Sequence, residues 1–550
     1  MSSPKSLKAF LIRHWAGLML LGIVVLGALF RFWRLTQYPM GLNQDEAYAG
    51  YEAYCLLTTG TDSHCIPWPV YFISWGSGMN VLYSYISIPF VAVFGLTTLA
   101  VRLPQAILGT VSILVAYGIG REIAKDGKKG LPLVLAAVTA ADPWHIMISR
   151  FGLEANLLMF FLLLGLWLTL LGLRRPPALL GAGIAFGLSL YCYAPIWVIL
   201  PFFLLLAFGY LLYMKRLRIT PWLIAGVAVL GLLAVPLVLF LLVNYGLIDE
   251  IITPYISIPR LLMMRHNYSL DDLGEKFTIL MRLLVTGQET LNTAQSDVVN
   301  GLHYIFSAPF WILGMVLQGI DLARSLRRRE YRPQVLFLLL FLCALPSTLL
   351  IDRLLIGRVT HDNTLVLAQL LLIGWGVYSA GAFLIERQPR LRQVAAAVMA
   401  VAYLGGLVSF RFSFFINHAV GWPFGYEEAI EAAENDPQQR KVYLSGNIHW
   451  PVLLFLTKLS PEEFQSSVTW KYYPGEFLEA KNIGRWYFDI DLQSIDPDGL
   501  YFVAADDASL TEVFSSIGMT CEAHGRYNLW YAEDPAAWAA EHGIEYTPAD

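Results

Sequence analysis

The chain has 550 residues, of which 56% are hydrophobic and 15% are charged, and its formal net charge is −4 at pH 7. This composition excludes an ordinary soluble globular protein, whose surface requires more charge. No basic tail or aromatic–basic patch supports a nucleic-acid partner, and five cysteines without a CxxC pair give no zinc or redox motif. Repeated apolar runs of about 17–22 residues predict a helical polytopic membrane protein.

Eleven segments are long and apolar enough to be predicted as membrane-spanning helices. They are residues 15–33, 103–122, 131–147, 153–172, 178–194, 195–213, 222–243, 303–321, 334–351, 365–384 and 394–411. The first segment is followed by arginines and lacks a small-residue cleavage site, so we expect a retained anchor. Residues 81–94 form an apolar segment that is too short for a span and is predicted to be re-entrant or interfacial.

The distribution of basic residues orients the predicted bundle. If 81–94 does not span, 20 Lys and Arg fall on the side of the N-terminus, and 11 fall on the other side up to residue 411. An excess of Lys and Arg marks the cytoplasmic side. We therefore expect a cytoplasmic N-terminus in the plasma (inner) membrane, with residues 34–101, 244–302 and the C-terminal region outside.

The region after residue 411 has a different pattern from the predicted membrane domain, residues 1–411. Short alternating or apolar runs predict strands, and longer runs between them predict helices. The predicted strands are KVYLSG, GRWYFDI, GLYFVAAD and YNLWYAE, and the predicted helices are EEAIEAAEN, PVLLFLTKL and SLTEVFSSIGM. Alternating strands and helices predict a small extracytoplasmic α/β domain over residues 412–550.

The first candidates for chemistry are the adjacent carboxylates Asp45 and Glu46. They lie in GLNQDEAYAGYEAY, residues 41–54, directly after the first predicted span. One interpretation is a general base or metal ligand at the membrane surface. The other is a helix start, with Asn43 as the N-cap and Glu46 as its capping-box partner. The surrounding tyrosines indicate a partly buried surface, which favours the functional interpretation.

Glu154 is a second candidate, in the short turn ADPWHIMISRFGLEAN between two predicted spans. The predicted topology places this turn on the same side as Asp45. Two carboxylates from separate loops on one side are an arrangement that acid–base or metal chemistry requires. The alternative is a helix N-terminal charge that the helix dipole favours.

Three arginines at predicted outer positions, Arg102, Arg150 and Arg358, form the third group. Guanidinium groups bind phosphate through paired donors, so these residues predict a phosphate or pyrophosphate group at the membrane surface. The alternative is snorkelling toward lipid headgroups. His361 could join Asp45 and Glu154 as a ligand of a divalent metal, with Mg²⁺, Mn²⁺ or Zn²⁺ as candidates. Asp362 and His303 could also add a metal ligand, and the alternative is that each histidine is a hydrogen-bonded structural residue.

Cys55 and Cys65 flank LLTTGTDSH in a predicted outside loop, where oxidation can occur. A small disulfide loop and two free thiols are both compatible with this spacing.

Three segments together resemble a known superfamily. They are NQDEAYAGYEAY, VFGLTTLAVRLPQAILG at residues 93–109, and ADPWHIMISRFGLEAN. The chain is similar in them to the protein O-mannosyltransferase and lipid A aminoarabinose transferase superfamily, including the bacterial lipopolysaccharide glycosyltransferases. The resemblance implies a GT-C-like fold and a polyprenyl-phosphate sugar donor. It implies that Asp45 is the essential carboxylate and that Glu154 is the second acidic residue. Trp75-Gly76-Ser77-Gly78 stands where some members have a Lys-Pro-Pro element.

The function that follows is transfer of a sugar from a polyprenyl phosphate to a lipid, glycan or protein acceptor, on the extracytoplasmic side and with inversion. A lipid-linked donor needs no nucleotide site, and no Gly-rich phosphate loop is present in the sequence. The alternative is a transporter or flippase for lipid-linked saccharides. That alternative predicts ionisable residues at mid-membrane depth and repeat-related broken helices, and the sequence shows almost no such residues in spans four to seven.

Overall fold

The computed structural model describes residues 4–124, 130–264, 268–288, 299–350, 359–416, 424–445, 448–475 and 477–546. Two compact units make up the chain. The first comprises Met1–Tyr38, Arg102–Leu239 and His266–His418, and the second comprises Pro39–Val101, Phe240–Arg265 and Ala419–Asp550. Each unit is therefore assembled from segments that are distant in the sequence.

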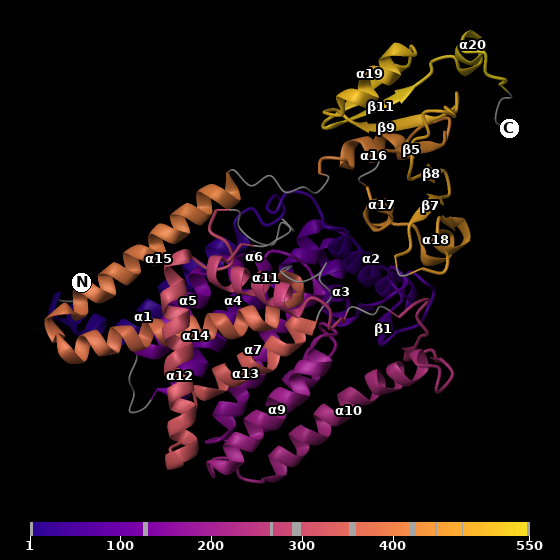
Figure 1. Cartoon of the computed structure of the whole chain (residues 1–550). Coiled ribbons are helices and arrows are strands. Elements are labelled where there is room, and N and C mark those ends of the chain that lie inside the picture. Colours follow the sequence, from indigo (N-terminus) through magenta and orange to yellow (C-terminus); the bar gives the residue numbers. More distant parts are fainter. Residues whose placement is uncertain are drawn as a thin grey trace. The chain divides into compact units, whose positions relative to one another are not determined.

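The first unit is helical (Figure 1), and two of its helices, α4 and α10, extend past its boundaries. Its helices are α1 (Pro4–Phe32), α4 (Thr98–Ile123), α5 (Gly130–Ala141), α6 (Pro143–Ile148), α7 (Glu154–Gly172), α8 (Ala178–Ser189), α9 (Ile196–Tyr213), α10 (Pro221–Asn244), α11 (Leu273–Thr286), α12 (Ala308–Arg328), α13 (Val335–Leu350), α14 (Val359–Arg387) and α15 (Arg392–Phe415).

Within the described residues, eight helices are long and apolar enough to cross a membrane. They are in α1, α4, α7, α9, α10, α12, α14 and α15, and each overlaps a predicted span. The shorter apolar helices α5, α8 and α13 overlap the other three. The chain is thus an integral membrane protein of the predicted helical class, while the number of spans and the orientation of the termini stay predictions.

The expected span 131–147 is interrupted, and the sequence explains why. Helix α5 ends at Ala141, and α6 starts with Pro143 at its first position. Proline fits a first helical turn but lacks the N–H that a continuous helix would need. The side chain of Asp142 caps α6 by accepting a hydrogen bond from the His145 amide. One apolar run therefore becomes two helices joined by a polar corner.

Helix α14 packs against α5, α7, α12 and α13. Its approach to α12 is close enough to need glycine: a Cβ on Gly376 would lie 1.9 Å from the carbonyl oxygen of Phe310. Small residues that let backbones approach are typical of membrane helix contacts.

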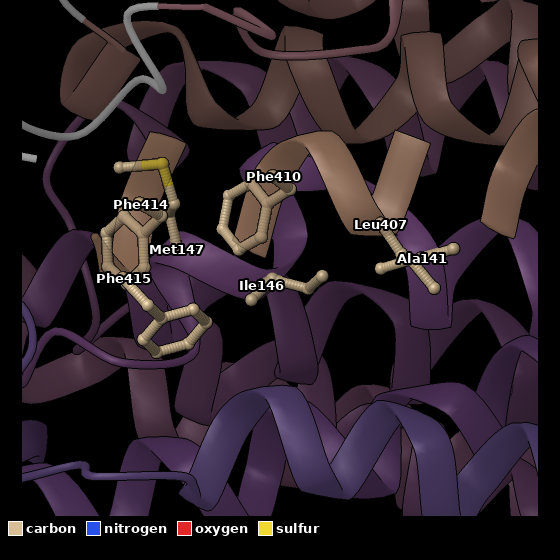
Figure 2. Close-up of a cluster of buried hydrophobic side chains, with 7 residues drawn as sticks. All are labelled: Ala141, Ile146, Met147, Leu407, Phe410, Phe414 and Phe415. Atoms are coloured by element: carbon tan, nitrogen blue, oxygen red, sulfur yellow. The ribbon is translucent and has the colours of Figure 1, made fainter. Parts of the chain in front are cut away.

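A cluster of buried side chains joins the end of α15 to the α5–α6 corner (Figure 2). It consists of Ala141, Ile146, Met147, Leu407, Phe410, Phe414 and Phe415. The rings of Phe410 and Phe414 stack with centroids 5.2 Å apart. Close-packed aromatic contacts of this kind fix the position of the corner.

The second unit contains two helices and two small hairpins ahead of a seven-stranded sheet. The first part comprises α2 (Gln44–Thr59), β1 (Tyr71–Phe72), β2 (Met79–Asn80), α3 (Leu82–Phe94), β3 (Ile251–Ile252) and β4 (Ser257–Ile258). The C-terminal part comprises α16 (Glu427–Glu434), β5 (Val442–Leu444), α17 (Trp450–Thr457), α18 (Pro461–Ser467), β6 (Val468–Trp470), β7 (Ala480–Ile483), β8 (Trp486–Tyr487), β9 (Leu500–Ala504), α19 (Ala508–Ser516), β10 (Thr520–His524), β11 (Tyr527–Tyr531) and α20 (Pro535–Glu541).

The sheet has the order β10-β11-β9-β5-β8-β7-β6. Strand β5 runs parallel to β8 and β9, and the remaining pairs are antiparallel. This mixed sheet with its helices confirms the predicted C-terminal α/β region. Helix α17 packs against α2, and the Tyr51 hydroxyl donates to the Leu459 carbonyl at 2.6 Å. The C-terminal region therefore shares a compact unit with the loop that follows α1, whereas the predicted boundary at residue 412 stays a prediction.

Candidate functional site

The acidic pair begins helix α2, and its two carboxylates have different surroundings. Asn43 is the N-cap, and its side-chain oxygen accepts from the Asp45 amide at 2.6 Å. The fully buried Glu46 carboxylate accepts from the Asn43 amide at 3.3 Å and completes a capping box. Such a box satisfies backbone donors that a helix start leaves unpaired. The capping interpretation of Glu46 is thus confirmed, and it does not extend to the half-buried Asp45 side chain.

Asp45 is oriented by an aromatic side chain. The indole Nε1 of Trp75 donates to Asp45 Oδ1 at 3.3 Å. Trp75 lies in the turn between β1 and β2, in the Trp-Gly-Ser-Gly segment. An N–H donor stabilises the charged form of a carboxylate and limits its rotation.

The C-terminal region holds this turn in place. The Trp75 carbonyl accepts from the Leu478 amide at 2.6 Å, and the Leu478 carbonyl accepts from Trp450 Nε1 at 2.9 Å. The Trp75 ring lies edge-on to Trp450, with centroids 5.1 Å apart, and to His449 at 6.0 Å. Gly76 has φ +103° and lies so close to residue 475 that a Cβ would be 2.2 Å from that carbonyl oxygen. Only glycine fits this position.

A second, deeper acidic group lies farther along α2. Glu52 and Asp62 are both fully buried, and Glu52 accepts from the amide and the hydroxyl of Ser63. Asp62 accepts from the amides of His64 and Ile66. Burial raises the pKa of Glu52 to about 7, and burial together with the neighbouring Glu52 raises the pKa of Asp62. Two acids in one dry site cannot both ionise readily, so this group favours holding a proton near neutral pH.

In the first unit, Arg150 is enclosed by the end of α1. Its Nη1 donates to the carbonyls of Phe30 and Arg31, and its Nη2 donates to those of Trp33, Arg34 and Tyr38, at 2.7–3.2 Å. The guanidinium also lies over the Phe415 ring, 4.9 Å from its centroid. The last carbonyls of a helix lack intrahelical partners, and a cation there offsets the dipole. These contacts make Arg150 a helix C-cap.

Two other arginines lie near this corner. Arg31 is fully buried and donates to the carbonyls of Thr139 and Ala140 at the end of α5 and to Ser149. Arg102, also fully buried, donates to the Leu35 carbonyl at 3.2 Å. The ends of α1 and α5 are thus capped by arginines from other segments of the chain.

Glu154 is the first residue of α7 and is half-buried. Polar groups gather just beyond it: Asn363 accepts from Trp144 Nε1 at 2.9 Å and donates to the Asn156 side-chain oxygen at 3.2 Å. This buried network ties the start of α7 to the start of α14.

The two candidate histidines have partners of their own. His361 Nδ1 lies 2.6 Å from the Tyr193 hydroxyl, and His303 Nδ1 lies 2.6 Å from Asp142 Oδ2. Each contact is of the kind that a hydrogen-bonded structural histidine makes. Within the described residues, no group of three or more His, Cys, Asp or Glu side chains is placed to hold a metal ion. Among these residues, the predicted metal ligands Asp45, Glu154 and His361 therefore do not form such a group.

Of the remaining predicted residues, Arg358 lies outside the described part of the chain. Cys55 is buried and Cys65 is exposed, and both are free thiols in the structure. Asp45 and Glu46 belong to the second unit, and Arg102, Arg150, Glu154 and His361 belong to the first.

Comparison with known proteins identifies the fold. Residues 80–240 match the family model for dolichyl-phosphate-mannose-protein mannosyltransferase. The predicted resemblance is confirmed. The fold is similar to that of ArnT from Cupriavidus metallidurans in the apo state, with a TM-score of 0.57 at 13% identity over 94% of this chain and 98% of that one. The same enzyme bound to undecaprenyl phosphate gives a TM-score of 0.54 at 13% identity over 94% and 97%.

An oligosaccharyltransferase from Archaeoglobus fulgidus, tethered to an acceptor peptide, matches with a TM-score of 0.51 at 13% identity over 82% of this chain. This chain spans only 64% of the length of that enzyme. No curated protein matches the chain. At these identities the solved structures establish the GT-C fold and not the substrate.

Sequence reasoning missed Trp75 as a partner of Asp45 and missed the network of Trp144, Asn156 and Asn363. The sequence did carry one signal for these residues: each is a polar or aromatic residue in or next to a turn that is otherwise apolar or rich in glycine. The partner in each case lies at least 30 residues away along the chain.

Proposed function

We propose that this chain is a glycosyltransferase that moves a sugar from a polyprenyl-phosphate donor to an acceptor hydroxyl, with Asp45 as the general base. The observation that carries the proposal is the different use of two adjacent carboxylates. Glu46 closes the helix cap, whereas Asp45 is half-buried and held by the Trp75 indole. A general base needs such a fixed and partly accessible carboxylate.

The reaction we propose is a single in-line displacement. The acceptor oxygen attacks the anomeric carbon while the bond from that carbon to the phosphate oxygen breaks. Asp45 takes the proton of the acceptor hydroxyl, and the lipid phosphate leaves with the bonding electrons. Attack opposite the leaving group inverts the anomeric configuration, and a base and acceptor held at reacting distance lower the barrier.

The donor class rests on the resemblance and on the fold. The similar ArnT was solved with undecaprenyl phosphate, which makes a polyprenyl phosphate the natural candidate for this chain. Arg102 and Arg358 remain candidates for the lipid phosphate, and Glu154 for a supporting carboxylate. We propose that Arg150 instead serves as the cap of α1, because its Nη groups bond to five backbone carbonyls.

The orientation is part of the proposal, with a cytoplasmic N-terminus and the acidic helix outside. Exposed positions on the two sides offer a test in a cysteine-free background. A membrane-impermeant maleimide added to whole cells should label Thr58→Cys and should not label Arg328→Cys before lysis. Labelling of the second variant and not the first would reverse the orientation.

Turnover of a defined donor tests the activity. Purified protein is incubated with a panel of polyprenyl-phosphate sugars and with lipid, glycan and peptide acceptors, and release of polyprenyl phosphate is measured. We expect release that depends on one sugar, and a product whose anomeric configuration is inverted. A flippase would move the intact donor across a vesicle membrane without releasing lipid phosphate. Transbilayer movement without release from any donor would therefore favour the transporter alternative.

A further inference from the structure

A cavity lies at the opposite ends of α4 and α7 from Arg102 and Glu154. It has a volume of about 440 Å³ and is bounded by the ends of α4, α7 and α8, the turn before α10, and Tyr331 and Pro333 ahead of α13. Three candidate spans have one end close to this cavity: those that end at Gly172 and Tyr213, and the one that starts at Pro221. Trp222 and Ile219 are exposed beside it, with 44% and 77% of their surfaces accessible. Exposed aromatic residues at span ends mark the headgroup layer.

The charged groups lining this cavity are mostly cations. They are Arg174, Lys215, Arg216 and Arg218, against one carboxylate, Glu122. Glu122 pairs with Arg174 at 3.7 Å, and Arg216 lies over the Tyr331 ring with its guanidinium carbon 5.0 Å from the centroid. In the described part of the chain, the side chains of Lys215 and Arg218 make no hydrogen bond or ion pair. The cavity therefore carries an excess of positive charge.

The backbone turn that brings these cations together has an unusual residue. The amide of Lys215 donates to the Leu212 carbonyl at 2.8 Å, and that of Arg216 donates to the Leu211 carbonyl at 2.9 Å. These two bonds form a Schellman motif at the end of α9. Lys215 occupies its left-handed position with φ +54°, where glycine is the unstrained choice.

The lining is also apolar on part of its surface, through Ile123, Leu170, Leu173, Leu179 and Leu217. Cations above an apolar floor, at the ends of membrane spans, match an amphiphile with an anionic head. Basic pockets between membrane helices are suited to phosphate headgroups.

We propose that this cavity binds the phosphate headgroup of an anionic phospholipid, with Lys215 and Arg218 as its principal contacts. The same phosphate chemistry could be supplied by free inorganic phosphate, and the experiment separates the two sources. The proposal does not depend on the enzymatic activity proposed above.

Lys215→Gly tests the site without endangering the fold, because glycine removes the cation and relieves the left-handed strain. Its control is Arg329→Gly, which removes a cation at φ +55° from the end of α12 and does not line the cavity. Native mass spectrometry of the full chain titrated with phosphatidylglycerol or phosphatidylcholine measures lipid binding. A thermal-shift titration measures inorganic phosphate.

We expect selective retention of phosphatidylglycerol by the wild type and the control. Affinity should fall roughly fivefold in Lys215→Gly and more than about tenfold in the Lys215→Gly/Arg218→Gln double variant. The apparent Tm of Lys215→Gly should equal or exceed that of the wild type. Equal retention of both lipids, unchanged binding in the double variant, or saturable stabilisation by inorganic phosphate without any lipid preference would each overturn the proposal.

Discussion

The acidic start of α2 and the arginine-capped end of α1 show two different outcomes for charged residues at helix ends. At α2, the cap uses Glu46, and the adjacent Asp45 is held by an indole from a separate turn. At α1, five carbonyls surround the Nη groups of Arg150. The carboxylates of the first region and the guanidinium of the second are both residue types that a sugar-phosphate site would use. At both helix ends, backbone groups that lack an intrahelical partner bind a charged side chain, and that side chain then stabilises the fold.

The largest effect on stability is expected at the end of α1. Arg150→Gln should leave several carbonyls at the end of α1 without their partner and lower the free energy of unfolding by more than about 3 kcal/mol. Arg150→Lys should not restore the stability, because a single ammonium cannot donate to five carbonyls as the two Nη groups of the guanidinium do. Thermal melting followed by size-exclusion chromatography measures the loss, with the exposed Arg34→Gln as the control. A fully stable Arg150→Gln protein that had lost turnover would restore the predicted phosphate role.

A smaller effect is expected at the indole that orients Asp45. Trp75→Phe removes one hydrogen bond to a carboxylate and keeps most of the ring packing, so kcat should fall roughly tenfold. Trp68→Phe is the matched control, since Trp68 is in the same loop and packs on Tyr85. An equal kcat in the two variants would remove Trp75 from the site.

The smallest effect concerns the buried acid Glu52, whose pKa burial raises from 4.5 to about 7. Between these values the folded protein binds more protons than the unfolded chain, so stability should decline as pH rises through this window. Melting scans between pH 5 and pH 8 should show a fall of a few degrees for the wild type. Glu52→Gln should flatten this dependence. A stability that rises with pH across the window in the wild type, and not in the variant, would contradict the assignment.

Much of the fold could be predicted from the sequence because local patterns determine it. The apolar runs correspond to the long helices, and the strand patterns around Val442, Leu500 and Tyr527 correspond to β5, β9 and β11. Strands β6, β7 and β10 were not predicted. They are short or polar on their exposed positions, and pairing with neighbours, rather than their own sequence, makes them strands.

The candidate site was predicted less completely, because most of its contacts join residues that are distant in the sequence. The capping box at Asn43 is local, so its spacing could be recognised in the sequence. The carbonyls around Arg150 lie 112–120 residues away along the chain, and Trp75 lies 30 residues from Asp45. No local pattern contains such contacts. Guanidinium chemistry alone predicts a phosphate site at Arg150, and the carbonyl contacts that favour a capping role are visible only in the structure.

The most direct test of the central claim compares the two adjacent carboxylates in one assay. Asp45→Asn and Glu46→Gln each replace a carboxylate with an amide of the same shape, and release of polyprenyl phosphate is measured beside the apparent Tm. Asp45→Asn should melt like the wild type and lose roughly a hundred- to ten-thousand-fold in turnover. Glu46→Gln should lose about 1 kcal/mol of stability and retain most of its turnover. A folded Asp45→Asn protein that transfers sugar at nearly the wild-type rate would contradict the account.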